Sequence, residues 1–218
     1  MSVLSPSVDI LPAAQRRLWV EFRTSLPATF VLYGGTALAL RTGSRESEDF
    51  DFFTNEPIDA HTLGGTLPFL RGAELIQAAP STATFLVDRG GPVKVSFFGA
   101  LLLGRVGEVS VCDDTGVRVA SLLDLAAQKV RVVQVRAERK DYLDLTTLMA
   151  HGISLPLALG AAQALYPDFA PLVTLKALTY FDDGDLAELP GDVKTRLAAA
   201  ASEVRAVDPV ELLSARLP

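Results

Sequence analysis

Two short segments carry the residues best suited to chemistry in this chain. The first is the glycine turn Gly34-Gly35-Thr36, and the second is a pair of acids, Asp49 and Asp51, set in a run of phenylalanines. Strand side chains alternate between the two faces, so acids separated by one residue project from the same face. Carboxylate oxygens are ligands that Mg²⁺ prefers, together with phosphates and water. The pair is therefore a candidate site for a divalent metal ion.

The glycine turn supplies the other half of the same chemistry. Glycines let the backbone approach a ligand closely, and N–H groups at the start of a helix attract phosphate. A phosphate cradle beside a metal clamp is the minimum for nucleotidyl transfer, because that reaction needs positioning and charge neutralisation more than covalent help. Taken singly, such a turn or such an acid pair is more often structural. Two charges inside an apolar strand are costly unless paired or metal-bound, which favours the metal site.

Alternating strands and helices must position these segments. The apolar pattern predicts strands at 30–33, 49–54, 73–79, 84–88, 93–98 and 117–120, and helices at 12–25, 36–42, 61–69, 155–166, 171–181 and 193–204. This order predicts an α+β fold in which a mixed β-sheet carries helices mainly on one side. We expect residues 1–120 to form this core. Residues 121–218 should form a helical C-terminal lobe that packs on the core and completes the site.

One further helix is predicted over 121–152, and it carries a row of charges. Lys129, Arg136 and Lys140 fall on roughly one face if this helix runs unbroken, and Asp144 extends the row. Spacing alone supports a solvated face with a pair between Lys140 and Asp144 as well as it supports a site.

Two arginines precede the acids and invite different interpretations. Arg45 could pair with Asp49 when the site is empty and with a triphosphate when it is loaded. Arg41 is better interpreted as structural, capping the end of the helix near Gly43.

Two parts of the chain together resemble the signature of the AbiEii/AbiGii toxin family of nucleotidyltransferases, within the DNA polymerase beta-like superfamily. One part of the resemblance covers residues 34–41 and 45–53, with the glycine turn and the Asp-x-Asp pair. The other covers residues 120–129 and 136–145, with a lysine-bearing helix and a Lys-Asp-x-x-Asp motif. Order and spacing agree over roughly residues 28–155, so the combined resemblance is specific although each piece alone is not.

The resemblance implies a nucleotidyltransferase fold and a transferase that uses Mg²⁺ or Mn²⁺. It implies transfer of a nucleotide from a nucleoside triphosphate to an acceptor hydroxyl, with tRNA or another RNA as the candidate acceptor, and a cognate antitoxin protein. Lys129 would contact phosphate, and Asp141 would orient a base or a metal-bound water. The implied site residues fall in three roles: catalysis by Asp49, Asp51, Lys129 and Asp141; metal binding by Asp49 and Asp51; and nucleotide binding by Gly34, Gly35, Thr36, Arg45 and Ser47.

One position departs from the family pattern. The third carboxylate is expected on a later strand, in a pattern like Val-Lys-Val-Asp-Phe-Phe, and this chain has Ser96 there. A hydroxyl neutralises no metal charge and is a poor proton acceptor. Asp141 or Glu48 could supply the acid, or one metal with substrate-assisted proton transfer could suffice. Alternatively, the chain is a non-catalytic nucleotide-binding or interaction protein. A small-molecule acceptor is a third possibility.

Composition narrows the classes of protein to which the chain can belong. The 218 residues, 49% of them hydrophobic, suffice for one domain or two small lobes. The net charge of −6 argues against a surface that coats nucleic acid and leaves room for a local basic funnel. A single cysteine, Cys112, excludes an internal disulfide framework and suits a reducing compartment. No apolar run has the length of a membrane span, so we expect a cytoplasmic protein without a membrane partner.

Overall fold

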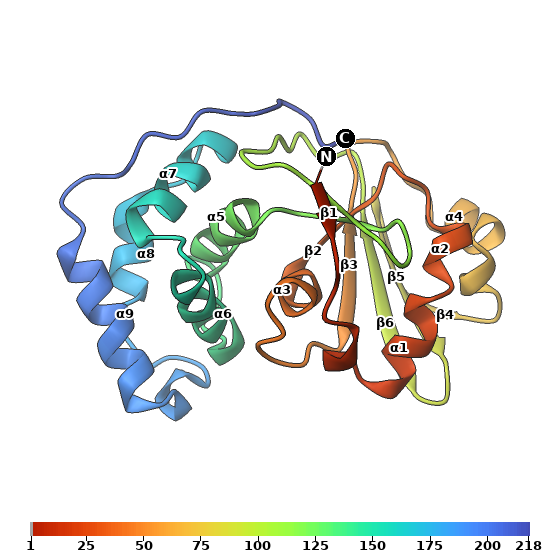
Figure 1. The fold of residues 1–218 in the computed structure, drawn as a ribbon, viewed down its shortest axis with the longest axis horizontal. Coiled ribbons are helices and arrows are strands. Elements are labelled where there is room, and N and C mark those ends of the chain that lie inside the picture. Colours follow the sequence, from red (N-terminus) through yellow and green to blue (C-terminus); the bar gives the residue numbers. More distant parts are fainter. Residues whose placement is uncertain (1) are drawn as a thin grey trace. The chain divides into compact units, whose positions relative to one another are not determined.

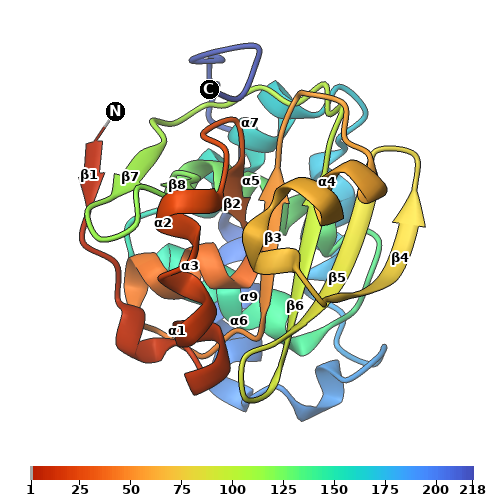
Figure 2. The same ribbon diagram turned by 90° about the vertical axis from the view of Figure 1, so that its right-hand side faces the viewer.

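The computed structural model describes residues 2–218, and the chain divides into two units. The first comprises the residues up to Gly104, together with Glu108–Ser121 and Ser214–Pro218. The second comprises Arg105–Gly107 and Leu122–Leu213. Figures 1 and 2 show the first unit as a sheet with helices and the second as helices joined by loops.

Within residues 2–218, the first unit is built on an eight-stranded sheet of order β1-β7-β8-β2-β3-β6-β5-β4 (Figure 2). The strands are β1 (Ser2–Leu4), β2 (Val31–Tyr33), β3 (Asp49–Phe53), β4 (Glu74–Ala79), β5 (Thr82–Asp88), β6 (Pro92–Phe98), β7 (Ser110–Cys112) and β8 (Arg118–Val119). The acid-bearing β3 lies inside the sheet, antiparallel to β2 and parallel to β6. Parallel and antiparallel pairs occur together, which confirms the predicted mixed sheet and the α+β class.

Phenylalanines hold β3 in the core. Phe50 and Phe52 are fully buried, whereas the alternating Asp49 and Asp51 remain partly exposed. The ring of Phe52 stacks on Phe97 of β6, with centroids 5.7 Å apart. Burying each such ring stabilises the fold by about 2–3 kcal/mol. The strand is therefore anchored through one face, and both acids emerge on the other.

Helices of the first unit lie on both faces of the sheet (Figure 1). They are α1 (Ala13–Trp19), α2 (Phe22–Ser25), α3 (Gly34–Thr42) and α4 (Ala60–Thr66), with the 3₁₀ turns η1 (Val8–Ile10) and η2 (Pro68–Leu70). Helices α1, α2 and α4 cover the phenylalanine face, where Phe22 contacts the rings of Phe50 and Phe52. Helix α3 covers the acid-bearing face. The expectation that helices lie mainly on one side therefore holds for α1, α2 and α4 but not for α3.

Several predicted boundaries differ from the observed ones. The helix expected over 12–25 is interrupted after Trp19, where the N–H of Glu21 bonds to the carbonyl of Leu18 in a tighter turn. The helix expected over 61–69 ends at Thr66, because Pro68 begins a 3₁₀ turn. Strands β1 and β7, three residues each, were not predicted. They pair in parallel with one another, and an element this short carries too little periodicity to be predicted.

The second unit is helical. Its helices are α5 (Leu122–Val132), α6 (Arg139–Ala150), α7 (Leu155–Leu165), α8 (Pro171–Ala177) and α9 (Gly191–Glu203), with the 3₁₀ turn η3 (Leu186–Glu188). The prediction of one unbroken helix over 121–152 is wrong, since α5 ends at Val132 and α6 starts at Arg139. Residues 133–138 link the two helices, and hydrogen bonds such as Val135 N–H to the Val132 carbonyl tighten this turn.

No single helix within residues 2–218 combines the length and apolarity of a membrane span. Helices α6 and α7 pass such a test only when taken together across a bend of 113°.

Candidate active site

The glycine turn and the second acid meet on the α3 face of the sheet. Strand β2 ends at Tyr33, which pairs with Asp51 of β3, and α3 begins at the next residue. Gly34 has a φ of +72°, and a Cβ at this position would lie 2.5 Å from Asp51 Oδ2. Only glycine fits both the backbone conformation and the space. The Asp51 carboxylate thus lies directly against the turn, as a shared phosphate and metal pocket requires.

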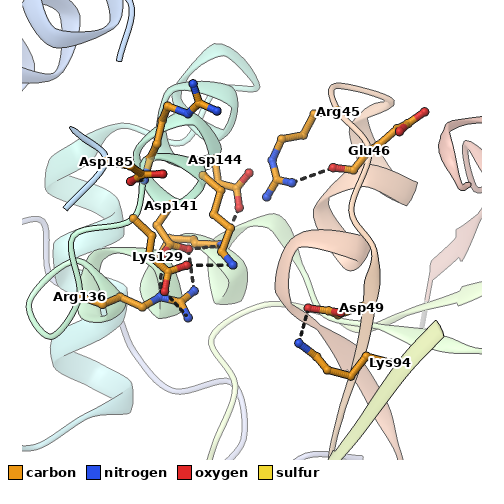
Figure 3. A network of polar contacts seen from close by, with 12 residues as sticks. Arg45, Glu46, Asp49, Lys94, Lys129, Arg136, Asp141, Asp144 and Asp185 are labelled. Atoms are coloured by element: carbon orange, nitrogen blue, oxygen red, sulfur yellow. Dashed lines mark hydrogen bonds and ion pairs between the residues drawn. The ribbon is translucent and has the colours of Figure 1, made fainter. Parts of the chain in front are cut away.

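The loop between α3 and β3 returns to the start of the same helix. A Cβ at Gly35 would lie 2.7 Å from Ser47 Oγ and 2.9 Å from Arg45 Nη2. Arg45 also donates from Nη1 to the carbonyl of Glu46, at 2.8 Å (Figure 3). A hydroxyl, a guanidinium and the first N–H groups of α3 therefore gather at one place. This combination favours an anion such as phosphate.

Thr36 has a role that its predicted assignment to nucleotide binding did not include. It is fully buried, and its hydroxyl donates to the backbone carbonyl of Asp49. Gln15 Nε2 approaches the same hydroxyl at 3.5 Å. The Thr36 side chain therefore joins α3 to the acid-bearing strand, and its backbone N–H is the part that belongs to the helix start.

Asp49 has an ion-pair partner that the sequence analysis did not select. Lys94 lies opposite Asp49 in the register of β3 and β6, and its Nζ is 2.7 Å from Asp49 Oδ2 (Figure 3). The sequence analysis considered only Arg45 for a pair with Asp49. The two side chains are partly exposed, at 42% for Lys94 and 35% for Asp49. The signal was present in the sequence, because Lys94 precedes Ser96 by two residues and so lies on the same face of its strand.

Ser96 stands directly opposite Asp51 in the same register. The residue is 4% exposed, and its hydroxyl lies 3.3 Å from Thr84 Oγ1 on β5. The position expected for a third acid therefore does lie beside Asp51, and it carries a neutral hydroxyl engaged within the sheet. Glu48, one alternative source of that acid, is exposed and immediately precedes β3.

In the second unit, Lys129 of α5 is held between two carboxylates of α6 (Figure 3). Its Nζ is 2.7 Å from Asp141 Oδ1 and 2.5 Å from Asp144 Oδ2. The lysine side chain is 6% exposed and both carboxylates are 0% exposed. The predicted residues Lys129 and Asp141 are thus in direct contact. Asp144 was not assigned to the site, although its spacing of three residues from Asp141 on one helix could have indicated it.

Arg136 completes this cluster. Its Nε donates to Asp141 Oδ2 at 2.8 Å, and its Nη2 donates to Oδ1 at 3.1 Å. Burial by itself raises the pKa of Asp141, but the hydrogen bond from Arg136 and the charge of Lys129 outweigh burial, so the pKa lies below its ordinary value. Asp141 is therefore an ionised carboxylate at neutral pH.

The interpretation of this segment as a solvated helix face with a pair between Lys140 and Asp144 is wrong. Lys140 pairs with Glu138 at 2.8 Å, and Asp144 is buried against Lys129. The break between α5 and α6 is the reason, because it removes the continuous face on which that pairing depended.

Arg41 is structural, as interpreted from the sequence, but it does not act through the helix end. Its Nε donates to the Ala120 carbonyl at 2.5 Å, and its Nη2 donates to the Val119 carbonyl at 3.0 Å and to Ser110 Oγ at 2.9 Å. The guanidinium therefore fastens α3 to the segment that contains β7 and β8. Gly43 terminates α3 on its own, with a φ of +62°.

Comparison with known proteins identifies the family. Residues 17–210 match the family described as "Nucleotidyl transferase AbiEii toxin, Type IV TA system". The chain belongs to the AbiEii toxin family. This AbiEii-family protein is accordingly an enzyme of the nucleotidyltransferase class. Its family is that of the toxin component of a toxin–antitoxin system. Among curated proteins it is 32% identical to an uncharacterised protein of Aquifex aeolicus (strain VF5) over 157 residues, which is 71% of this chain and 74% of that protein.

Two solved structures share the fold of the AbiEii-family chain. One is MenT4, a nucleotidyltransferase toxin from Mycobacterium tuberculosis H37Rv, with a TM-score of 0.60 and 13% identity over 88% of this chain and 83% of that one. The other is a protein from H. pylori assigned to the nucleotidyltransferases, with a TM-score of 0.54 and 21% identity over 85% and 89%. These likenesses confirm the predicted nucleotidyltransferase fold.

The donor set of this AbiEii-family site fits one divalent cation. Asp49 and Asp51 project from one face of β3, and the glycine at position 34 leaves room for the Asp51 carboxylate. Within residues 2–218, no group of three or more His, Cys, Asp or Glu side chains is arranged to hold a metal. Mg²⁺ commonly takes one or two protein carboxylates and completes its shell with substrate phosphates and water. The two aspartates match that habit.

Proposed function

We propose that this toxin-family nucleotidyltransferase requires Mg²⁺ and transfers a nucleotide from a nucleoside triphosphate to a hydroxyl of RNA, with tRNA as the first acceptor to test. The single observation that carries the proposal is the contact between the Asp51 carboxylate and the Gly34 turn. This contact places a carboxylate that can bind a cation beside a turn that can bind phosphate, so that one metal–triphosphate complex could contact both. We further propose a cytoplasmic location, where such substrates occur.

The residues of the first unit divide the work of binding and charge neutralisation. The first N–H groups of α3 and the guanidinium of Arg45 would bind the triphosphate, and the Ser47 hydroxyl would donate to one of its oxygens. Asp49 and Asp51 would hold the cation, which would neutralise charge that develops on the reacting phosphate. Thr36, through its bond to the Asp49 carbonyl, would keep the cradle and the acids in register.

Two residues of the second unit remain in the proposal on the strength of the sequence motif. Lys129 is proposed to contact phosphate, and Asp141 is proposed to orient a proton acceptor. The depressed pKa of Asp141 supports the second role, because a carboxylate that orients another group by accepting its hydrogen bond must be ionised at working pH.

The partners follow from the family. A toxin of a type IV toxin–antitoxin system implies a cognate antitoxin protein, and a nucleotidyltransferase implies a nucleoside triphosphate. RNA is proposed as the acceptor because it presents accessible hydroxyl groups. The net charge of −6 leaves the recognition of RNA to a local cluster of cations.

The decisive experiment combines the purified protein with each labelled nucleoside triphosphate, total tRNA and Mg²⁺. Label should appear on RNA with the wild-type chain and disappear with Asp51→Asn, which keeps the size of the side chain and removes its charge. Glu74→Gln is the matched control, since Glu74 is an exposed strand carboxylate on the β4 edge of the same sheet. Equal labelling by wild type and Asp51→Asn would refute the proposed site.

The alternative is a nucleotide-binding protein without turnover, and the neutral Ser96 opposite Asp51 favours it. In that case, triphosphate would bind with Asp51-dependent affinity while tRNA, total RNA, proteins and small hydroxyl compounds all stayed unlabelled. Transfer to any of these acceptors would eliminate the alternative, and the labelled acceptor would name the substrate class.

A further inference from the structure

The row of side chains shared by β3 and β6 has an unusual charge balance. Asp49 faces Lys94 and Asp51 faces Ser96 across the same pair of strands. We propose that this face binds one divalent cation, and that the ammonium of Lys94 provides, beside Asp49, the positive charge that a second cation would provide. This inference rests on the proposed function, because it concerns the same cation site.

The ion pair at Asp49 is the first argument. Two cations 3.5–4 Å apart, as in two-metal sites, need carboxylates with enough oxygens to bind both ions. Here, one oxygen of Asp49 already lies 2.7 Å from Lys94 Nζ. A second cation at this carboxylate would meet a positive charge at contact distance. A divalent ion and an ammonium this close repel one another even in water.

The neutral position opposite Asp51 is the second argument. Ser96 adds no charge, and its hydroxyl lies 3.3 Å from Thr84 Oγ1. Two aspartates and one lysine give this row a net charge of −2 + 1 = −1. One divalent cation brings that sum to +1, whereas two would bring it to +3. Without a bound triphosphate, the row therefore lacks the negative charge that would hold two divalent cations.

The placement of Lys94 does not suggest a role in holding the sheet together. Its side chain is 42% exposed, and ion pairs at such exposure contribute little to stability. The neighbouring strand residues Val95 and Phe97 are buried and anchor β6. An ammonium on a flexible stem, beside a cation ligand, is instead suited to stabilise negative charge on a bound phosphate.

The test measures Mn²⁺ binding without nucleotide, by electron paramagnetic resonance, so that it does not depend on activity. Wild type should bind one ion per chain. Ser96→Asp should bind a second ion, because it adds a third carboxylate and makes the net charge of the row −2. Ser96→Asn is the matched control, because asparagine has the size of aspartate but no charge, and this variant should bind one ion.

Replacement of Lys94 separates its role from a structural one. Lys94→Met should bind Mn²⁺ roughly tenfold more tightly, because a neighbouring positive charge is removed. The same variant should transfer nucleotide to RNA more slowly, because positive charge beside the phosphates is lost. Tighter metal binding together with slower transfer is a combination that a purely structural lysine would not produce.

The outcomes distinguish the inference from the function on which it rests. Two Mn²⁺ ions on wild type, or unchanged Mn²⁺ affinity in Lys94→Met, would overturn the inference and leave the nucleotidyl-transfer proposal standing. Absence of Mn²⁺ binding, with equal labelling of RNA by wild type and Asp51→Asn, would overturn both. If Ser96→Asp does not fold, the Lys94→Met measurement decides alone.

Discussion

Removal of the buried ammonium of Lys129 should destabilise the helical unit strongly. Lys129→Met keeps a long, unbranched side chain while deleting the charge that lies 2.7 Å from Asp141 and 2.5 Å from Asp144. Both carboxylates are 0% exposed, so water cannot replace the lost partner. Removing one partner of a buried ion pair costs about 3–5 kcal/mol.

The free energy of protonating a carboxylate sets an independent upper limit on this loss of stability. The variant could relieve the excess negative charge by protonating one of the two carboxylates. For an aspartate with an ordinary pKa of about 3.9, protonation at pH 7 costs about 4 kcal/mol, at about 1.4 kcal/mol per pH unit. Because the proton would be bound in the folded state, the deficit should shrink as the pH falls, to roughly 1.5 kcal/mol at pH 5.

Urea unfolding followed by far-ultraviolet circular dichroism is the appropriate assay, because the second unit is helical. Lys140→Met is the matched control, since Lys140 is 53% exposed and pairs with Glu138 at the surface. We expect this control to lose less than about 0.5 kcal/mol. The reasoning would be refuted by a loss in Lys129→Met no larger than that of Lys140→Met at pH 7, or by a deficit that stays constant between pH 7 and pH 5.

Three further outcomes follow from the structure. Gly34→Ala should weaken Mn²⁺ binding, because its Cβ would displace the Asp51 carboxylate; unchanged affinity in a titration would contradict the described pocket. Burial raises the pKa of Cys112 to about 12, so the native thiol should resist Ellman's reagent at pH 8 and react only after denaturation. Arg136→Met should raise the pKa of Asp141, which lies below its ordinary value in the folded chain. The stability that Asp141 contributes is present above about pH 4 and lost below it, so the unfolding free energies of the variant and wild type should differ most at pH 7 and converge in acid.

Much of the first unit could be predicted from local sequence pattern. The alternation of Phe50 and Phe52 with Asp49 and Asp51 required one buried face and one polar face, and the structure has both. The glycine turn and strands β2 and β3 were predicted for the same reason. Side-chain periodicity and turn chemistry act between residues that are close along the chain.

The interactions that complete each polar cluster depended on tertiary structure. Lys94 reaches Asp49 only because β3 and β6 pair in parallel with these two residues opposite one another. The sequence of either strand alone does not determine this register. Lys129 meets Asp141 and Asp144 only because α5 ends at Val132 and α6 packs back against it. An unbroken helix would have left those charges in water. The sequence by itself determined which residue types line each strand and helix. The pairing of distant segments decided which charges are buried, because the desolvation that makes a charge costly arises only when another element covers it.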